Sequence, residues 1–312
     1  DFVCMPMRWN ALEPEEGEYS FTKTDKWVEW AVREAKLPVH AGPLIDFRAG
    51  RTPEWLHIWE NDYDTLREVC FEHLKRVVTR YRKAVTRWVV CSGLHLNEAF
   101  PLTLEQLLDL TRLCVMVVKK LQPAGEVVVE IDQPFGEHYA TNDRSVPPLL
   151  YAEMAHQQGV DIDAFGLRIQ MGDGGAGRSV RDMMRLSAML DSYAMFDRPL
   201  VVTALGVPSA PTPGGEAAGR WRKAWSGEAQ AEWLSEAVSI CLSKPFVRSV
   251  CWQELYDPPN AASLEQEHGG LIGADGKPKP GLARIARVRQ MMRDRKTPLG
   301  LGASLPEPAR SV

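Results

Sequence analysis

Carboxylates at the ends of predicted strands are the residues of this sequence best suited to chemistry. Asp132 follows Glu130 by two residues, so the strand period of two points both side chains to the same side of a sheet. Two carboxylates this close raise the pKa of one of them unless Arg168 or Arg8 pairs with them. The pattern is typical of an acid–base site, and also of a structural ion pair inside a barrel mouth. Glu98 is the third candidate, with a solvated loop glutamate as its plainer interpretation.

The elements that must position these groups alternate along the chain. Apolar, β-branched segments predict strands at 2–8, 38–45, 87–92, 126–132, 164–170, 199–205 and 247–252. Amphipathic segments between and after them predict helices near 24–36, 63–84, 103–121, 147–158, 179–193, 228–243 and 280–294. Side chains that can cap a helix favour several of these starts, namely Thr24, Asp64, Thr103 and Ser179.

This alternation predicts an α/β fold, a (β/α)₈ TIM barrel of which strands two to eight are evident. A barrel without one strand would expose two unpaired edges, so the first strand is expected to be missing or supplied from upstream residues. Residues 1–296 form the predicted barrel domain. Residues 297–312 are rich in Pro, Gly, Ser and Ala and are expected to be a disordered tail or linker. Loops rich in Gly or Pro are predicted at 172–177, 208–219 and 257–270.

Charge, motifs and cysteine usage give no support to several classes of function. The net charge is −4 with 25% charged residues, which gives no reason to expect a nucleic-acid or membrane partner. No Gly-rich phosphate loop, CxxC motif or Cys/His ligand spacing occurs, so no cofactor and no metal are predicted. The six cysteines lie in apolar segments and favour a reduced state.

Several segments, in order, resemble family 10 of the glycoside hydrolases, the xylanase family. The opening resembles that family's second strand and the loop after it, through Met7-Arg8-Trp9, Leu12-Glu13-Pro14, Gly17, Tyr19 and Phe21. "RYRKAVTRWVV" with "LNEAF" resembles the fourth strand and its acid/base loop, and "DIDAFGLRIQ" the sixth strand. "RPLVVTALGVPS" resembles the seventh strand, and "VRSVCWQELYD" with "HGGLIGADGKPKPGL" the eighth and its closing helix. The resemblance covers roughly residues 2–292.

The resemblance implies a carbohydrate substrate and a role for each matching residue. It implies that Glu98 is the general acid/base and that Asn97 contacts a sugar hydroxyl. The family's seventh strand ends in Thr-Glu-Leu, whose glutamate is the nucleophile, whereas this chain has Thr203-Ala204-Leu205. Ala204 therefore marks a lost nucleophile position, because a methyl group cannot form a glycosyl-enzyme bond.

Further departures affect the substrate-binding positions and make plain xylan a doubtful substrate. Arg8 replaces the family's lysine, Asp46 lies where a histidine-containing segment is expected, and the sixth strand carries Arg168 and Gln170. Replacement chemistry would come from strand-end carboxylates, with Asp132 as the second catalytic candidate. The predicted substrate-binding set is Asn97, Arg8, Asp46, Glu137, Arg168, Gln170, Trp252 and Gln253.

Three functions stay open. The first is a divergent glycoside hydrolase acting on a poly- or oligosaccharide with Glu98 as acid. The second is a catalytically inactive, carbohydrate-binding barrel, and the third an engineered nucleophile mutant, at Ala204, of a retaining endo-xylanase-like enzyme. The resemblance suggests a secreted or periplasmic protein, while cysteine usage favours a reducing compartment. Protein partners and oligomeric state are not indicated.

Overall fold

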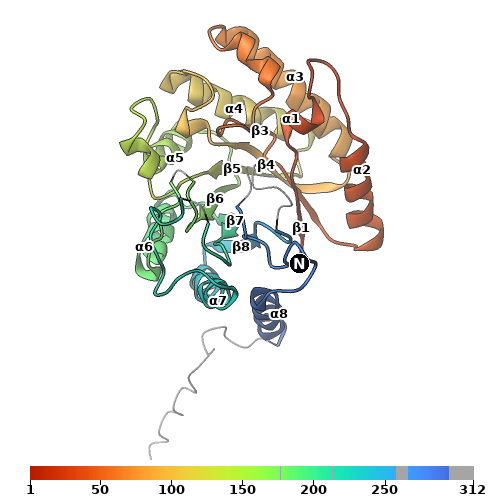
Figure 1. Ribbon diagram of the computed structural model, residues 1–312. Helices are drawn as coiled ribbons and strands as arrows, with labels where there is room; N and C mark the ends of the chain where they lie inside the picture. Colours follow the sequence, from red (N-terminus) through yellow and green to blue (C-terminus); the bar gives the residue numbers. More distant parts are fainter. Residues whose placement is uncertain (176, 213, 258–265, 295–312) are drawn as a thin grey trace, which may run out of the picture.

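The computed structural model describes residues 1–175, 177–212, 214–257 and 266–294. Its strands form one parallel sheet that curls into a barrel with the helices outside (Figure 1). The order is β1, β2, β4, β5, β6, β7 and β8, with β3 paired to β4 beyond β2. The strands are β1 (Val3–Met5), β2 (Val39–Ala41), β3 (Ile45–Asp46), β4 (Val85–Ser92), β5 (Glu126–Ile131), β6 (Ala164–Gln170), β7 (Leu200–Gly206) and β8 (Val247–Trp252). The predicted TIM-barrel class is confirmed.

The predicted strand 38–45 is split in two. β2 pairs with the first half of β4, and β3 pairs with its last residues, so both occupy one position of the barrel. Between them lies Gly42, with φ of 130°. A Cβ there would lie 2.3 Å from the carbonyl oxygen of Val89, so only glycine allows this close passage. The barrel therefore has seven strand positions.

The barrel is not closed by backbone pairing. Within the described part of the chain, β1 pairs only with β2 and β8 only with β7. Side chains approach across the seam, where a hydrogen bond with Cys251 on β8 raises the pKa of the Cys4 thiol on β1. All six cysteines are free thiols, and four of them are buried. Cys4 is exposed because it lies at this seam.

Seven longer helices follow the strands, close to the predicted ranges. They are α2 (Thr22–Glu29, continued by the π-helix η1, Trp30–Glu34), α3 (Tyr63–Tyr81), α4 (Leu104–Leu121), α5 (Pro148–Gln157), α6 (Met183–Tyr193), α7 (Gly227–Ser243) and α8 (Pro280–Arg293). Short elements that were not predicted are α1 (Trp9–Leu12) and the 3₁₀ turns η2 (Glu54–Trp59), η3 (Leu94–Leu96), η4 (Glu137–Ala140) and η5 (Ala194–Phe196).

Of the four predicted helix caps, one is found in the structure. Thr103 caps α4 in a capping box with Gln106, as its spacing predicts. The other three predicted caps are wrong, because nearby residues bond the first turn or the helix starts elsewhere. Asp62 caps α3 and Asp182 caps α6, in place of Asp64 and Ser179. The helix predicted to start at Thr24 begins at Thr22 without a side-chain cap.

The barrel interior changes from apolar to charged along the strands. Val89, Val128, Ala164 and Val201, one from each of β4 to β7, form a small cluster of buried side chains. Glu130 lies two residues after Val128 and Asp132 lies four residues after it, so both belong to the same strand face as Val128. Asp132 itself follows the end of β5. The carboxyl ends of the strands therefore carry the polar groups. No helix among the described residues is long and apolar enough to span a membrane, and the predicted tail 297–312 lies outside the described residues.

Candidate active site at the carboxyl ends of the strands

A cavity of about 390 Å³ opens at the carboxyl ends of β4, β5 and β6. Glu98 and Asp132 line it from the segments after β4 and β5, and Arg168 and Gln170 line it from β6. The glycine-rich loop predicted at 172–177 forms another wall, as expected of loops after barrel strands. The structure thus brings together four of the residues that the sequence predicted for the site.

Glu98 is held by its carboxylate at the cavity wall. The chain reaches it through Asn97, which has a left-handed backbone conformation with φ of 52°. The backbone N–H of Ala49 donates to Oε2 of Glu98 at 2.9 Å, and Nε2 of His138 lies 3.4 Å from Oε1. The Glu98 side chain is 19% exposed, so it remains accessible from the cavity.

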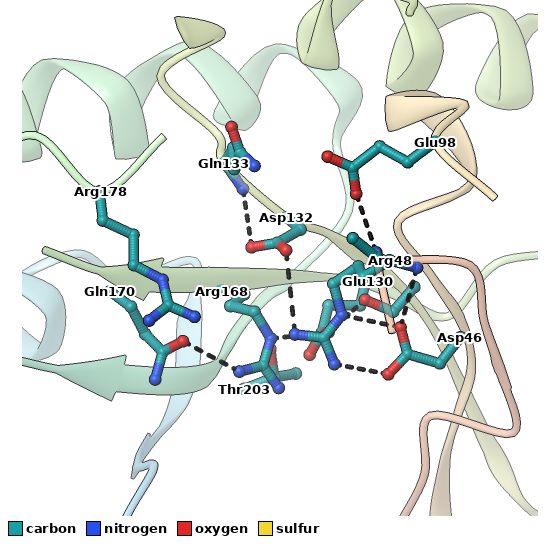
Figure 2. A network of polar contacts seen from close by, with 12 residues as sticks. Asp46, Arg48, Glu98, Glu130, Asp132, Gln133, Arg168, Gln170, Arg178 and Thr203 are labelled. Carbon is teal, nitrogen blue, oxygen red and sulfur yellow. Dashed lines mark hydrogen bonds and ion pairs between the residues drawn. The ribbon is translucent and has the colours of Figure 1, made fainter. Parts of the chain in front are cut away.

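Asp132 and Asp46 are linked by Arg48 (Figure 2). The Arg48 guanidinium donates to both oxygens of Asp46 at 2.7 and 2.6 Å, and its Nη1 lies 3.8 Å from Asp132. Burial lowers the pKa of Arg48, but the charge and hydrogen bonds of Asp46 outweigh burial and raise it above the ordinary value. Gly93 makes room for this arginine, since a Cβ there would lie 2.4 Å from Cγ of Arg48.

Glu130 does not line this cavity and is buried, with its Oε1 in hydrogen bonds. Its Oε1 accepts hydrogen bonds from the Ser92 hydroxyl at 2.6 Å and from Nε of Arg168 at 3.2 Å. Burial raises the pKa of Glu130, yet the nearby guanidinium groups of Arg168 and Arg48 bring it below the ordinary value. Arg168 also donates to Gln170 at 3.4 Å. Of the two carboxylates predicted as a pair, Glu130 therefore has a lowered pKa because arginines surround it.

A second cavity, of about 160 Å³, occupies the barrel interior near the open seam. Arg8, Asp46 and Gln253 line this cavity rather than the one beside Glu98. Arg48, Arg51 and Arg168 line both cavities and form the boundary between them. Burial raises the pKa of Glu254 and lowers that of Arg8. Burial, followed by repulsion from Arg48, lowers the pKa of Arg51 to about 10.

No His, Cys, Asp or Glu cluster suited to a metal ion occurs in the described residues.

Comparison with known proteins agrees with this architecture. Glycosyl hydrolase family 10 matches residues 5–104, which include Glu98. Endo-1,4-beta-xylanase B of Thermotoga neapolitana is 31% identical over 93 residues, which are 30% of this chain and 25% of the relative. Endo-1,4-beta-xylanase 3 of Hypocrea jecorina is 23% identical over 212 residues, 66% of this chain and 57% of the relative. These matches thus span about a quarter and just over half of the relatives' length.

The solved structures extend the likeness over the whole barrel. Native xylanase 10B from Thermotoga maritima has a TM-score of 0.70 at 19% identity, over 95% of this chain and 89% of that one. The chain therefore has the same fold as this xylanase. Xylanase 10B from Thermotoga petrophila RKU-1, in complex with xylobiose, gives a TM-score of 0.67 at 19% identity over 93% of this chain and 86% of that one.

Ala204 lies in the β7 segment that pairs with β6. Its side chain is fully buried, and it lines neither cavity. In the register of the two strands its Cα faces that of Arg168. The position at which the resemblance expects a nucleophile is thus next to an arginine that already pairs with Glu130.

Three predicted binding residues lie away from both cavities of the domain. The amide of Asn97 donates to the carbonyls of Leu102 and Arg144 and accepts from the N–H of Leu102, so it braces the loop. Glu137 forms an ion pair with Arg181.

Trp252 is the third. Its Nε1 donates to the carbonyl of Gly269 at 2.9 Å, and its ring packs edge-on against Trp233 at 6.4 Å. The Nε1 atom and part of the ring of Trp252 thus contact other residues of the chain, which favours a packing role over stacking against a sugar ring.

The sequence reasoning named Arg168 but missed two further arginines, Arg48 and Arg51, and one histidine, His138. Arg48 and Arg51 follow β3 closely, and His138 stands in η4 after β5. A signal existed for Arg48, because a cation two residues after the strand-end Asp46 is a ready ion-pair partner. His138 gave no comparable signal, because its contact with Glu98 depends on how two separate loops fold together.

Proposed function

We propose that this xylanase-like domain hydrolyses glycosidic bonds of a poly- or oligosaccharide, with Glu98 as the general acid. The observation that carries the proposal is that Glu98 and Asp132, two accessible carboxylates from adjacent strands, line one cavity. Their side chains are 19% and 15% exposed. The endo-1,4-β-xylanase relatives and the xylobiose complex of the Thermotoga petrophila enzyme support a carbohydrate as substrate.

Asp132 is the best candidate for the second carboxylate. Asp46 is held by both of its oxygens on Arg48, and Glu137 is occupied by Arg181 outside the cavity. Asp132, by contrast, has no closer ion-pair contact among the described residues than Nη1 of Arg48 at 3.8 Å, and its side chain is 15% exposed. With alanine at position 204, this site fits an inverting reaction, in which Asp132 activates a water molecule and Glu98 protonates the leaving oxygen.

The test is turnover on a panel of xylan, glucan and mannan substrates and their oligosaccharides. Glu98→Gln and Asp132→Asn should each reduce the rate by about 10²- to 10⁴-fold. Glu137→Gln is the matched control, because it also removes a carboxylate near the strand ends and should leave the rate within about twofold. Proton NMR of the first product should show inverted anomeric configuration. Retention, or full activity of Glu98→Gln, would overturn these roles.

A second candidate function is carbohydrate binding without turnover. The observation that favours it is the buried alanine at the position of the family nucleophile. It predicts calorimetric binding of xylo-, gluco- or manno-oligosaccharides with no product from any of them.

The third possibility is that the chain is an engineered nucleophile mutant, at Ala204, of a retaining enzyme. It predicts that Ala204→Glu, or azide or formate added to the present chain, yields strong hydrolysis. If neither treatment yields turnover on the panel, the engineered-mutant hypothesis fails.

A further inference from the structure

Arg178 reaches the larger cavity from the loop after β6. It lines this cavity together with Glu98 and Asp132. The three residues come from the segments after β6, β4 and β5, and β5 lies between the other two strands in the sheet. Figure 2 shows Glu98 and Arg178 on opposite sides of Asp132. A ligand that extends from Glu98 past Asp132 therefore reaches Arg178.

The loop after β6 fixes the guanidinium group in this place. Nη1 of Arg178 donates to Oδ2 of Asp173 at 2.7 Å, and Oδ1 of Asp173 accepts the backbone N–H of Gly175 at 2.9 Å. The carbonyl of Arg178 accepts the N–H of Gly172 at 2.7 Å. A Cβ at Gly175 would lie 2.8 Å from Cδ of Arg178, so glycine leaves the space that the arginine occupies. Both the backbone and the side chain of Arg178 are thus held before a ligand arrives.

Most of the hydrogen-bond donors of Arg178 remain available. A guanidinium group carries five N–H donors in a planar fork. Among the described residues, the Arg178 side chain donates only to Asp173. It is 22% exposed, whereas the Asp173 side chain is 8% exposed, so the arginine is the accessible member of the pair. A rigid fork of this kind suits two acceptor oxygens that lie next to each other.

The charge of the larger cavity favours a neutral ligand. Asp173 compensates the charge of Arg178 at 2.7 Å. Among the described residues, the lining contains Arg178 and the three arginines that it shares with the smaller cavity. It also contains four carboxylates, Glu98, Asp132, Asp173 and Glu267, so the formal charges cancel. Neighbouring hydroxyl groups of a sugar offer two acceptor oxygens to the fork without adding a charge.

We propose that Arg178 binds two neighbouring hydroxyl oxygens of a neutral sugar unit and so determines which glycans the site accepts. The inference rests on the proposed function and adds a specificity-determining residue to it. Asp173 is the residue that positions Arg178. Because Arg178 lies beyond Asp132 as seen from Glu98, its hydrogen bonds hold the sugar equally in the ground state and the transition state. Its loss should therefore raise KM and leave kcat nearly unchanged.

The first test is calorimetric binding of xylo-, gluco- and manno-oligosaccharides to the full chain. Arg178→Gln should weaken the tightest of these complexes by about 10- to 100-fold, the equivalent of hydrogen bonds from a charged group. Arg178→Lys keeps the charge but lacks the fork, so its affinity should lie between the two. Arg181→Gln is the matched control, because Arg181 is three residues away and pairs with Glu137 outside both cavities. It should change the affinity by less than about twofold.

The second test uses deoxy analogues of the tightest-binding oligosaccharide. Removing a hydroxyl group that Arg178 contacts should weaken binding to the unsubstituted chain but not to Arg178→Gln, which is a double-mutant cycle between protein and ligand. The corresponding uronic acid oligosaccharide tests the charge argument. If it binds more tightly than the neutral sugar, and only when Arg178 is present, the ligand is an anion and the inference is wrong.

Binding and turnover separate this inference from the proposed function. An affinity that Arg178→Gln leaves unchanged, or that Arg181→Gln lowers equally, would overturn the role of Arg178 whether or not hydrolysis occurs. Arg178-dependent binding without turnover on any glycan would support that role and refute the proposed function. Where hydrolysis occurs, KM of Arg178→Gln should rise by the same factor as the affinity falls, with kcat within about threefold. Absence of binding by every glycan would overturn both.

Discussion

Replacing Arg48 with methionine is the sharpest test of how the site is held together. Arg48 and Asp46 are 10% and 7% exposed, and their two hydrogen bonds of 2.7 and 2.6 Å leave each group dependent on the other. Removing one partner of such a buried pair costs about 3–5 kcal/mol, because the remaining charge stays buried without compensation. Methionine keeps most of the side-chain volume, so the loss reports charge rather than a cavity. We expect Arg48→Met to lower the free energy of unfolding by this amount.

Urea unfolding followed by circular dichroism measures the loss. Arg33→Met is the control, because Arg33 pairs with Glu29 on the surface at 76% and 58% exposure and should cost less than about 0.5 kcal/mol. Asp46→Asn combined with Arg48→Met should recover part of the stability, since no charge is then buried alone. A loss below about 1 kcal/mol would refute this reasoning.

Asn97→Ala should lower the unfolding free energy by about 2–3 kcal/mol, because three hydrogen bonds to loop backbone disappear. The affinity for sugar, measured by calorimetry, should be the same in Asn97→Ala and Asn97→Gly. Burial lowers the pKa of His95 to about 4, so between that value and about 6.5 the unfolded chain binds a proton that the folded one does not. Stability should therefore rise with pH across this window, and urea unfolding at several pH values should show a flatter curve for His95→Gln. Trp252→Phe should cost about 1 kcal/mol through its lost bond to Gly269 while sugar affinity stays unchanged; a large loss of affinity would instead place Trp252 in the binding site.

The sequence predicted the barrel well because periodicity is a property of each segment. The segments 126–132 and 164–170 were recognised as strands from their apolar residues, and the structure has β5 and β6 there. Helix starts were predicted less well, since Asp62 and Asp182 compete with neighbouring capping residues and only the folded chain selects one. The split into β2 and β3 depends on the approach of Gly42 to β4, which no local pattern records.

The site was predicted in part, and the missing part is mostly cationic. Strand-end position placed Glu98 and Asp132 at one cavity, because parallel strands bring their carboxyl ends to the same edge. The resemblance assigned Asn97 to the ligand, whereas its amide is used entirely by loop backbone. His138 contacts Glu98 from a loop that is far away in the sequence, so no spacing rule could have shown it, whereas Arg48 lies two residues after its partner Asp46.

The arginines also bear on whether Ala204 alone separates this domain from a retaining enzyme. Arg168 faces Ala204 across the strand register and already binds Glu130, which is 2% exposed. A glutamate at position 204 would place a second carboxylate beside the same guanidinium, and one cation cannot fully compensate two buried anions. The alanine and the Arg168–Glu130 pair are therefore mutually consistent. We therefore predict that Ala204→Glu alone does not yield hydrolysis, and turnover of that variant on the same substrates is the measurement.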